Sequence, residues 1–210
     1  MVKQSLFTNL NRVKKDLCVL IFLSLASSGC QANEHNTETF SPLINGLSAG
    51  YYSKETGCVT VGNLSAKLEL DEFEQDLHVF DSANCKNSSL LYKKKLSIES
   101  QIAGIWNRHI VIDEGTDANG RELHLLSSTD KNIAHKFYYA LMPEFKATTL
   151  VFMMPLDTPA KPEQCASDQK ESLKEWKRLG FELELAEERT FDVTKGTTSI
   201  GSKRLCFPLQ

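Results

Sequence analysis

The sequence predicts a mainly β protein, an antiparallel meander that forms a small barrel or sandwich, with one α-helix at about residues 168–179. Most of the chain divides into short segments in which apolar and polar residues alternate, which is the two-residue period of a half-buried strand. Turn-forming Gly, Asn and Asp residues separate these segments, and only one segment has apolar residues at helical spacing. Many short strands followed by one late helix indicate a single antiparallel architecture.

The individual strands follow from alternation and composition. Residues 64–70 alternate Leu and Ala with Ser, Lys and Glu, whereas residues 148–154 are apolar on both faces, which indicates a covered strand. The clearest hairpin signal is Asn119-Gly120, because this pair favours the positive-φ turns that match strand twist. The expected strands are 58–61, 64–70, 77–80, 90–98, 105–113, 121–127, 136–139, 148–154, 181–185 and a last strand that contains 204–207.

A narrow apolar stripe of Leu173, Trp176 and Leu179 predicts the helix. Asp168 and Glu171 have the spacing of a capping-box variant, which places the start of the helix near residue 168. Gly180 then fits the position that follows the end of a helix.

The first residues have the parts of a secretory signal. Residues 1–16 carry four basic side chains and one acid, and residues 17–26 (LCVLIFLSLA) are uncharged and apolar. Ten apolar residues in a helix cover about 15 Å, half of a bilayer core of ~30 Å, so this segment is too short for an ordinary span. We therefore expect a signal peptide over residues 1–29.

Residues 25–30 (LASSGC) resemble the lipobox of bacterial lipoprotein precursors, although that pattern prefers Leu where Ser27 stands. The resemblance implies that Cys30 is acylated and becomes the new N-terminus, that residues 30–40 form a flexible tether, and that Gln31 directs the protein to the outer membrane. Several acyl chains on one residue anchor a protein stably. Ordinary cleavage after Ser28 or Ala32 is the alternative and would give a soluble periplasmic or secreted protein.

The charge of the exported part differs from that of the whole chain. The net charge is −3 over 210 residues, but the signal residues 1–16 contribute +3, so the remainder carries −6. An acidic body without a basic stripe excludes nucleic acid as a partner class. We expect residues 41–210 to form a single exported domain, with residues 160–210 as an alternative appendage.

Four cysteines remain after Cys18 leaves with the signal and Cys30 is assigned to lipid. An even number in an exported protein predicts two disulfides, for which three connectivities exist. The spacing favours Cys58–Cys85 and Cys165–Cys206, each of which stabilises by about 2–4 kcal/mol.

Residues 50–98 resemble small bacterial exported domains with a lipocalin-like meander, most of which lack an assigned activity. The likeness rests on Gly50-Tyr51-Tyr52, on Cys58 and on the later turn Asp81-Ser82-Ala83-Asn84-Cys85, which is one residue longer than the pattern. The resemblance supports a fold and implies no function.

Two histidines are candidate metal ligands. His109 and His124 lie on the two arms of the predicted hairpin and are expected to face each other, with Asp113 or Glu122 completing a Zn or Cu site. The competing interpretation is that both are ordinary side chains of alternating strands. We expect no cofactor.

Aromatic pairs offer candidate contact residues for a ligand or partner: Tyr51, Tyr52, Tyr138 and Tyr139. Strand alternation sends one ring of each pair inward and the other outward. The outward rings could line a ligand mouth or a protein contact, and the alternative is that they form the rim of an ordinary core.

No catalytic motif of the GxSxG, HExxH or phosphate-loop type is present in the sequence, so we expect a protein that is not an enzyme. The favoured function is a non-catalytic envelope lipoprotein that binds a small apolar ligand or an envelope protein. The alternatives are an inhibitor or immunity protein that blocks a basic partner enzyme, and an envelope hydrolase that uses carboxylates from residues 71–76.

Overall fold

The computed structural model describes residues 37–209, apart from residues 41, 43, 45, 49, 54, 55, 118 and 119. These residues belong to one compact unit. The expected signal peptide, the acylation site Cys30 and most of the expected tether lie outside the described residues. The end of that tether is a strand and not a flexible chain, because β1 (Thr37–Phe40) pairs with β2 (Gly50–Ser53).

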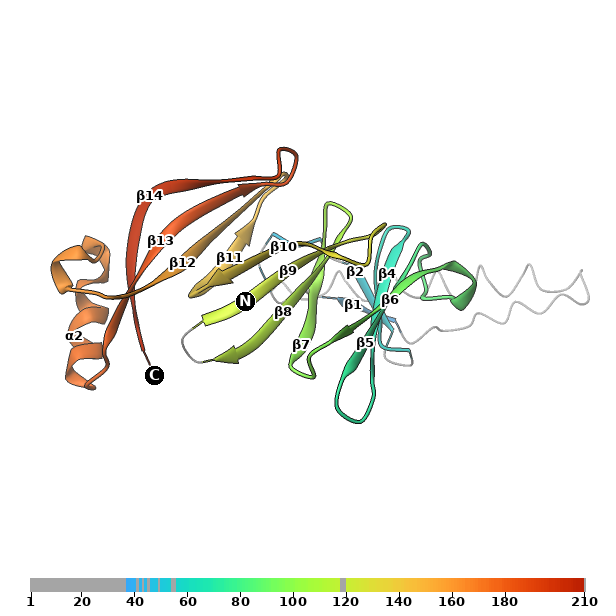
Figure 1. The fold of residues 1–210 in the computed structure, drawn as a ribbon, viewed down its shortest axis with the longest axis horizontal. Helices are drawn as coiled ribbons and strands as arrows, with labels where there is room; N and C mark the ends of the chain where they lie inside the picture. The colour runs from blue at the N-terminus through green and yellow to red at the C-terminus, as the bar shows by residue number, and fades with distance from the viewer. Residues whose placement is uncertain are drawn as a thin grey trace, which may run out of the picture. The chain divides into compact units, whose positions relative to one another are not determined.

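The described strands form three antiparallel sheets, in which neighbours along the chain are also neighbours in the sheet (Figure 1). Sheet A consists of β1, β2, β3 (Cys58–Val61), β4 (Leu64–Leu70), β5 (Gln75–Phe80) and β6 (Leu90–Leu96). Sheet B consists of β7 (Ser100–Trp106), β8 (His109–Asp117), β9 (Gly120–Ser127) and β10 (Ile133–Tyr139). Sheet C consists of β11 (Leu141–Phe145), β12 (Thr149–Pro159), β13 (Leu183–Asp192) and β14 (Thr197–Pro208).

The predicted mainly β meander is confirmed, and of the two predicted closures the sandwich fits whereas the barrel is wrong. The chain leaves sheet A after β6, makes a tight turn in which Ser100 N donates to Ser97 O at 3.0 Å, and begins sheet B with β7. β6 and β7 therefore belong to different sheets, and sheet A is not closed on itself. Residues 50–98 form the expected meander, as strands β2 to β6 of this open sheet.

Sheet B is buried on both faces, which is the main feature of the packing. One face joins sheet A in a core made of Val59, Leu64, Ala66, Leu77, Val79, Leu96, Ile102, Ile105, Ile110, Ile112 and Leu126. The other face joins sheet C in a core made of Ile44, Leu47, Ala103, Trp106, Val111, Leu123, Leu125, Phe137, Tyr139, Phe145, Leu150, Phe152 and Phe191. Each fully buried Leu, Ile or Phe stabilises the fold by about 1.5–3 kcal/mol relative to its exposure.

Two side-chain hydrogen bonds tie the sheets together at the edges of these cores. The hydroxyl of Tyr92 on β6 donates to the carbonyl oxygen of Ser127 on β9 at 2.6 Å. The indole Nε1 of Trp106 on β7 donates to the carbonyl oxygen of Lys146, which precedes β12, at 2.7 Å. Both side chains are largely buried, and their polar atoms are thereby satisfied.

Cysteines join in the pairs that the spacing favoured, Cys58–Cys85 and Cys165–Cys206. The first disulfide packs on Phe80, and it fixes the loop after β5 to β3. The second connects the segment before the helix to β14, and residues 160–210 supply both β13 and β14 of sheet C.

One α-helix, α2 (Lys170–Arg178), follows the short 3₁₀ turns η2 (Pro162–Gln164) and η3 (Ser167–Gln169). The predicted end is confirmed, since Gly180 has φ +80° and Phe181 N donates to Trp176 O at 3.0 Å. The predicted capping by Asp168 is wrong, because the N-cap is Gln169 and makes no side-chain cap. Among the described residues, no helix is long and apolar enough to cross a membrane.

The expected strand 105–113 is divided by a turn that the sequence did not indicate. β7 ends at Trp106, β8 begins at His109 opposite it, and Asn107 and Arg108 have φ values of +45° and +61°. Positive φ at two consecutive residues is the geometry of a type I′ hairpin turn. Arginine is strained there because its Cβ approaches the following carbonyl oxygen.

We predict that Arg108→Gly raises the free energy of unfolding by about 1 kcal/mol, because glycine adopts positive φ without strain. Urea denaturation of the protein measures the change. The matched control Arg108→Ala keeps the Cβ and is expected to gain nothing. A glycine variant no more stable than the alanine variant would contradict the strain at this turn.

Candidate functional site

An open pocket of about 430 Å³ lies where sheets A and B meet at one end of their shared core. Sheet A and its turns contribute one side, and β8 and β9 contribute the other. Its lining residues are Phe73, Glu74, Lys95, Leu96, Ser97, Ile98, Glu114 and His124.

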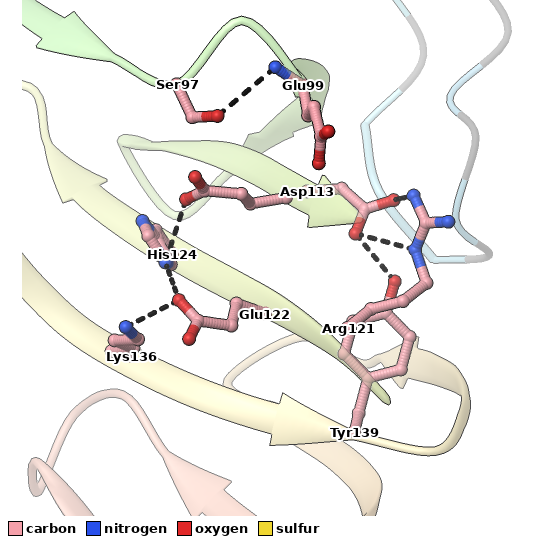
Figure 2. Close-up of polar contacts among 9 residues, drawn as sticks. Ser97, Glu99, Asp113, Arg121, Glu122, His124, Lys136 and Tyr139 are labelled. Atoms are coloured by element: carbon pink, nitrogen blue, oxygen red, sulfur yellow. Dashed lines mark hydrogen bonds and ion pairs between the residues drawn. The ribbon is translucent and has the colours of Figure 1, made fainter. Parts of the chain in front are cut away.

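On the sheet A side of the pocket, the side-chain amide of one glutamine fixes the turn between β6 and β7. Gln75 is the first residue of β5, and its Nε2 atom donates to the carbonyl oxygens of Ser97 (3.3 Å), Ile98 and Ser100 (3.1 Å). Glu99 N also donates to Ser97 Oγ at 3.3 Å within the same turn (Figure 2). These bonds fix the turn that carries Ile98, so the wall of the pocket is preorganised.

The sheet B side is a cluster of polar side chains on three neighbouring strands. Glu114 on β8 lies directly opposite Glu122 on β9, and Lys136 on β10 lies directly opposite His124 on β9. Strand alternation places these four residues on the face that packs against sheet A, beyond Ile112 and Leu126 of the apolar core. Figure 2 shows His124, Glu122 and Lys136 converging on one another.

The two carboxylates of this cluster have unequal partners. His124 Nε2 lies 2.9 Å from Glu122 Oε2, which is a hydrogen bond, but 3.6 Å from Glu114 Oε2, which is too long for one. Lys136 Nζ also lies 2.5 Å from Glu122 Oε2. Glu122 therefore takes both donors, the imidazole of His124 and the ammonium of Lys136. Among the described residues, the distant His124 is the only partner of the Glu114 carboxylate.

These contacts control the ionisation of Glu122. Burial alone would raise the pKa of Glu122, but hydrogen bonds from Lys136, His124 and Tyr138 outweigh burial and lower the pKa to about 2. Glu122 is consequently ionised at any physiological pH, and its charge is matched within the cluster.

A second network holds the same hairpin from its opposite face. Arg121 donates through Nε and Nη2 to the two carboxylate oxygens of Asp113 at 3.1 and 2.6 Å, and the hydroxyl of Tyr139 donates to Asp113 Oδ1 at 2.7 Å (Figure 2). Asp113 and Tyr139 are buried towards sheet C. This bidentate pair fixes the end of the β8–β9 hairpin that carries Glu114 and Glu122.

The expectation that His109 and His124 face each other is wrong. His109 lies opposite Ser127 and Trp106, while His124 lies opposite Ile112, so the two histidines are separated along the hairpin and on opposite faces. Asp113 lies on the face opposite to His124, where it binds Arg121, and it contacts neither histidine.

Within the part of the chain that the structure describes, the group that could hold a metal ion is Glu114, Glu122 and His124, whose ligand atoms lie within 4.8 Å of one another. Imidazole and carboxylate are ordinary ligands of Zn²⁺. Two of the three ligand atoms are already engaged, however, since His124 Nε2 bonds Glu122 and the Lys136 ammonium contacts the same oxygen. A metal ion would have to displace both contacts.

The carboxylates required by the hydrolase alternative are only partly brought together. Glu74 and Glu114 both line the pocket, but Glu74 forms an ion pair with Lys95. A general acid needs a raised pKa. Burial and then the charge of Asp157 raise the pKa of Glu184, which is on sheet C and is not a pocket residue.

Alternation of the aromatic pairs is confirmed. Tyr51 and Tyr138 are exposed, whereas Tyr52 packs against the core and Tyr139 is buried. Only Tyr138 lies beside the polar cluster, where the Lys136 ammonium is 5.2 Å from the centre of its ring.

The residues that were not candidates from the sequence include Ile98 and Glu114, which line the pocket, and Lys136, which contacts Glu122 beside it. Lys136 and Glu114 become neighbours of His124 only through strand register, which the sequence does not fix when a hairpin contains an irregularity. Phe73 was not a candidate either, although an aromatic residue within the acidic segment 71–76 is a usable signal for an exposed ring.

We predict that Glu122→Gln lowers the free energy of unfolding by about 2–3 kcal/mol at pH 7. A carboxylate with a pKa of about 2, against 4.5 without these contacts, stabilises fully above pH 4.5 and loses its effect as the pH falls through 2. The difference between wild type and variant should therefore vanish near pH 2 in urea titrations at successive pH values. Glu163→Gln, on the exposed turn η2, is the matched control, and a pH-independent loss in Glu122→Gln would contradict the prediction.

Comparisons of the chain with protein-family models, with curated proteins and with solved structures found no match in any of the three. The function is therefore argued from the geometry, burial and charge described above, together with the sequence patterns.

Proposed function

We propose that the chain is a non-catalytic binding module of the bacterial cell envelope, which recognises a basic protein partner through the open end of the interface between sheets A and B. The lipobox-like segment supports export and attachment through a lipid on Cys30, with the outer membrane as the destination. The body would then be held near the membrane and present this face to other envelope proteins.

The observation that carries the proposal is a group of exposed apolar side chains around the pocket. Phe73 is 84% exposed, Leu70 is 72% exposed and Ile98 is 52% exposed. Leu70 ends β4, Phe73 lies in the four-residue turn that follows, and both precede the strand whose Gln75 holds Ile98 in place. Large apolar side chains that gather at one place on a soluble surface typically mark a contact site.

The charge around this group favours a basic partner. The carboxylates of Glu74, Asp76 and Asp71 all act on one cation of the pocket, Lys95. Glu114 adds a further negative charge on the opposite side. Because the exported chain also carries −6 overall, a basic surface would be attracted over a long range and oriented towards this end.

A protein partner is favoured over a small apolar ligand. The spaces between the sheets are filled by the side chains of the two cores, and the pocket is open to solvent and partly lined by charged groups. A site for a small apolar ligand is normally an enclosed and mainly apolar cavity. The inhibitor or immunity function is a particular case of this proposal, in which the basic partner is an enzyme.

The proposal predicts a position-specific contact in the envelope of the native host. A photo-crosslinking residue in place of Phe73 should give one discrete covalent adduct, and mass spectrometry should identify a partner with a basic surface. The adduct should be lost when Asp71 and Glu74 are both changed to Lys, since reversed charge repels that surface.

The matched control position is Met142 on β11 of sheet C, which is 60% exposed and apolar but distant in sequence and sheet from the pocket. Equal adducts at Phe73 and Met142, or an adduct that survives the charge reversal, would refute a docking site at the pocket.

A further inference from the structure

We propose that the pocket binds the guanidinium group of an arginine side chain of the partner, with the Glu114 carboxylate as its counter-ion. The inference rests on the proposed function in one respect, which is that the arginine belongs to a protein partner. It concerns the chemistry of the pocket, which can be tested without that partner.

The first support is that no described residue lies within hydrogen-bond distance of the Glu114 carboxylate. Its carboxylate is half-buried at the base of the pocket, with 20% of the side chain exposed, and its only partner among the described residues is His124 Nε2 at 3.6 Å. A carboxylate accepts several strong hydrogen bonds, and the described residues supply none of them to Glu114. Glu114 is therefore a ready acceptor for an incoming cation.

The second support is that the neighbouring nitrogen donors are already bound to other carboxylates. His124 and Lys136 both contact Glu122, and Lys95 contacts Glu74. In the described part of the chain, none of these three side chains lies within hydrogen-bond distance of the Glu114 carboxylate, which therefore stays available to a ligand. The buried ring of His124 also leaves Nδ1 without a partner, which makes this side of the pocket under-satisfied.

The third support is the composition of the walls. Phe73, Leu96 and Ile98 line the path to Glu114 with apolar surface. An arginine side chain has an apolar stem and a charged planar end, so it would lay its methylenes along these residues and direct its guanidinium at the carboxylate. The volume of about 430 Å³ accommodates one long side chain and lies in the range of about 300–1,000 Å³ for ligand pockets.

An organic cation suits the cluster better than a metal ion. A metal ion would need Glu122 and His124 as ligands and would have to break their mutual hydrogen bond and the Lys136 contact. A guanidinium needs only Glu114, whose one contact among the described residues is the long one to His124, and its parallel N–H groups match the two oxygens of one carboxylate.

The test is an NMR titration of the exported chain with Nα-acetyl-arginine methylamide, followed through the methyl groups of Leu96 and Ile98. We expect saturable shifts with a Kd on the order of millimolar, which is typical of one isolated side chain. The citrulline analogue has the same shape without the charge and should bind at least about tenfold more weakly.

Two variants make the test specific. Glu114→Gln should weaken arginine binding by about tenfold or more, while Glu99→Gln should leave it unchanged, because Glu99 is an exposed carboxylate of the adjacent turn that does not line the pocket. Equal binding of the citrulline analogue, or an equal loss in both variants, would overturn the proposal. Tight binding of ZnCl₂ that is lost in both Glu114→Gln and His124→Gln would overturn it in favour of a metal site.

The outcomes separate this inference from the proposed function. Arginine binding without a crosslink at Phe73 would refute the protein-docking function and leave the pocket chemistry standing. A crosslink at Phe73 without arginine binding would refute the role of Glu114 and leave the docking face standing.

Discussion

Sheet B lies between two hydrophobic cores, so each polar side chain on it must find a partner inside the protein or reach an open end of a core. The β8–β9 hairpin extends beyond both cores and carries Asp113 towards sheet C and Glu114 towards sheet A. Asp113 is fully matched by Arg121 and Tyr139. On the sheet A face, Glu122 also has close partners, His124 and Lys136, but Glu114 does not. Glu114 is the one of these two carboxylates that lines the pocket.

Glu122 and Glu114 differ in their partners because of the register of the β8–β9 hairpin. Glu114 and Glu122 are directly opposite, a placement that repels unless cations lie between or beside them. Lys136 reaches only the outer carboxylate, because β10 pairs with β9 and not with β8. His124 also forms its hydrogen bond with Glu122. The carboxylate of Glu114 on β8 is thus left without a close partner among the described residues, and it lines the pocket between sheets A and B.

Much of the fold could be predicted from alternation and turn residues, as β4 over 64–70 and the helix end at Gly180 illustrate. The turn at Asn107 and Arg108 could not, because arginine is rare at positive φ and tertiary packing overrides that preference. For the site, His124 and Glu122 were identified together, but Glu114 and Lys136 were not. A two-residue turn at Asn119-Gly120 would place Glu114 opposite Leu125, whereas an irregularity between Glu114 and Asp117 places it opposite Glu122. Ile98 joins the site only through the packing of sheet A turns against sheet B.

The division of partners between Glu122 and Glu114 can be measured directly on the imidazole of His124. Long-range ¹H–¹⁵N NMR spectra should show a slowly exchanging Hε2 proton, since Nε2 donates to Glu122 inside a buried cluster. The proton should persist in Glu114→Gln and exchange rapidly in Glu122→Gln. Loss of the proton in Glu114→Gln with retention in Glu122→Gln would show that His124 serves the pocket carboxylate, and Glu114 would then not be free to bind a ligand.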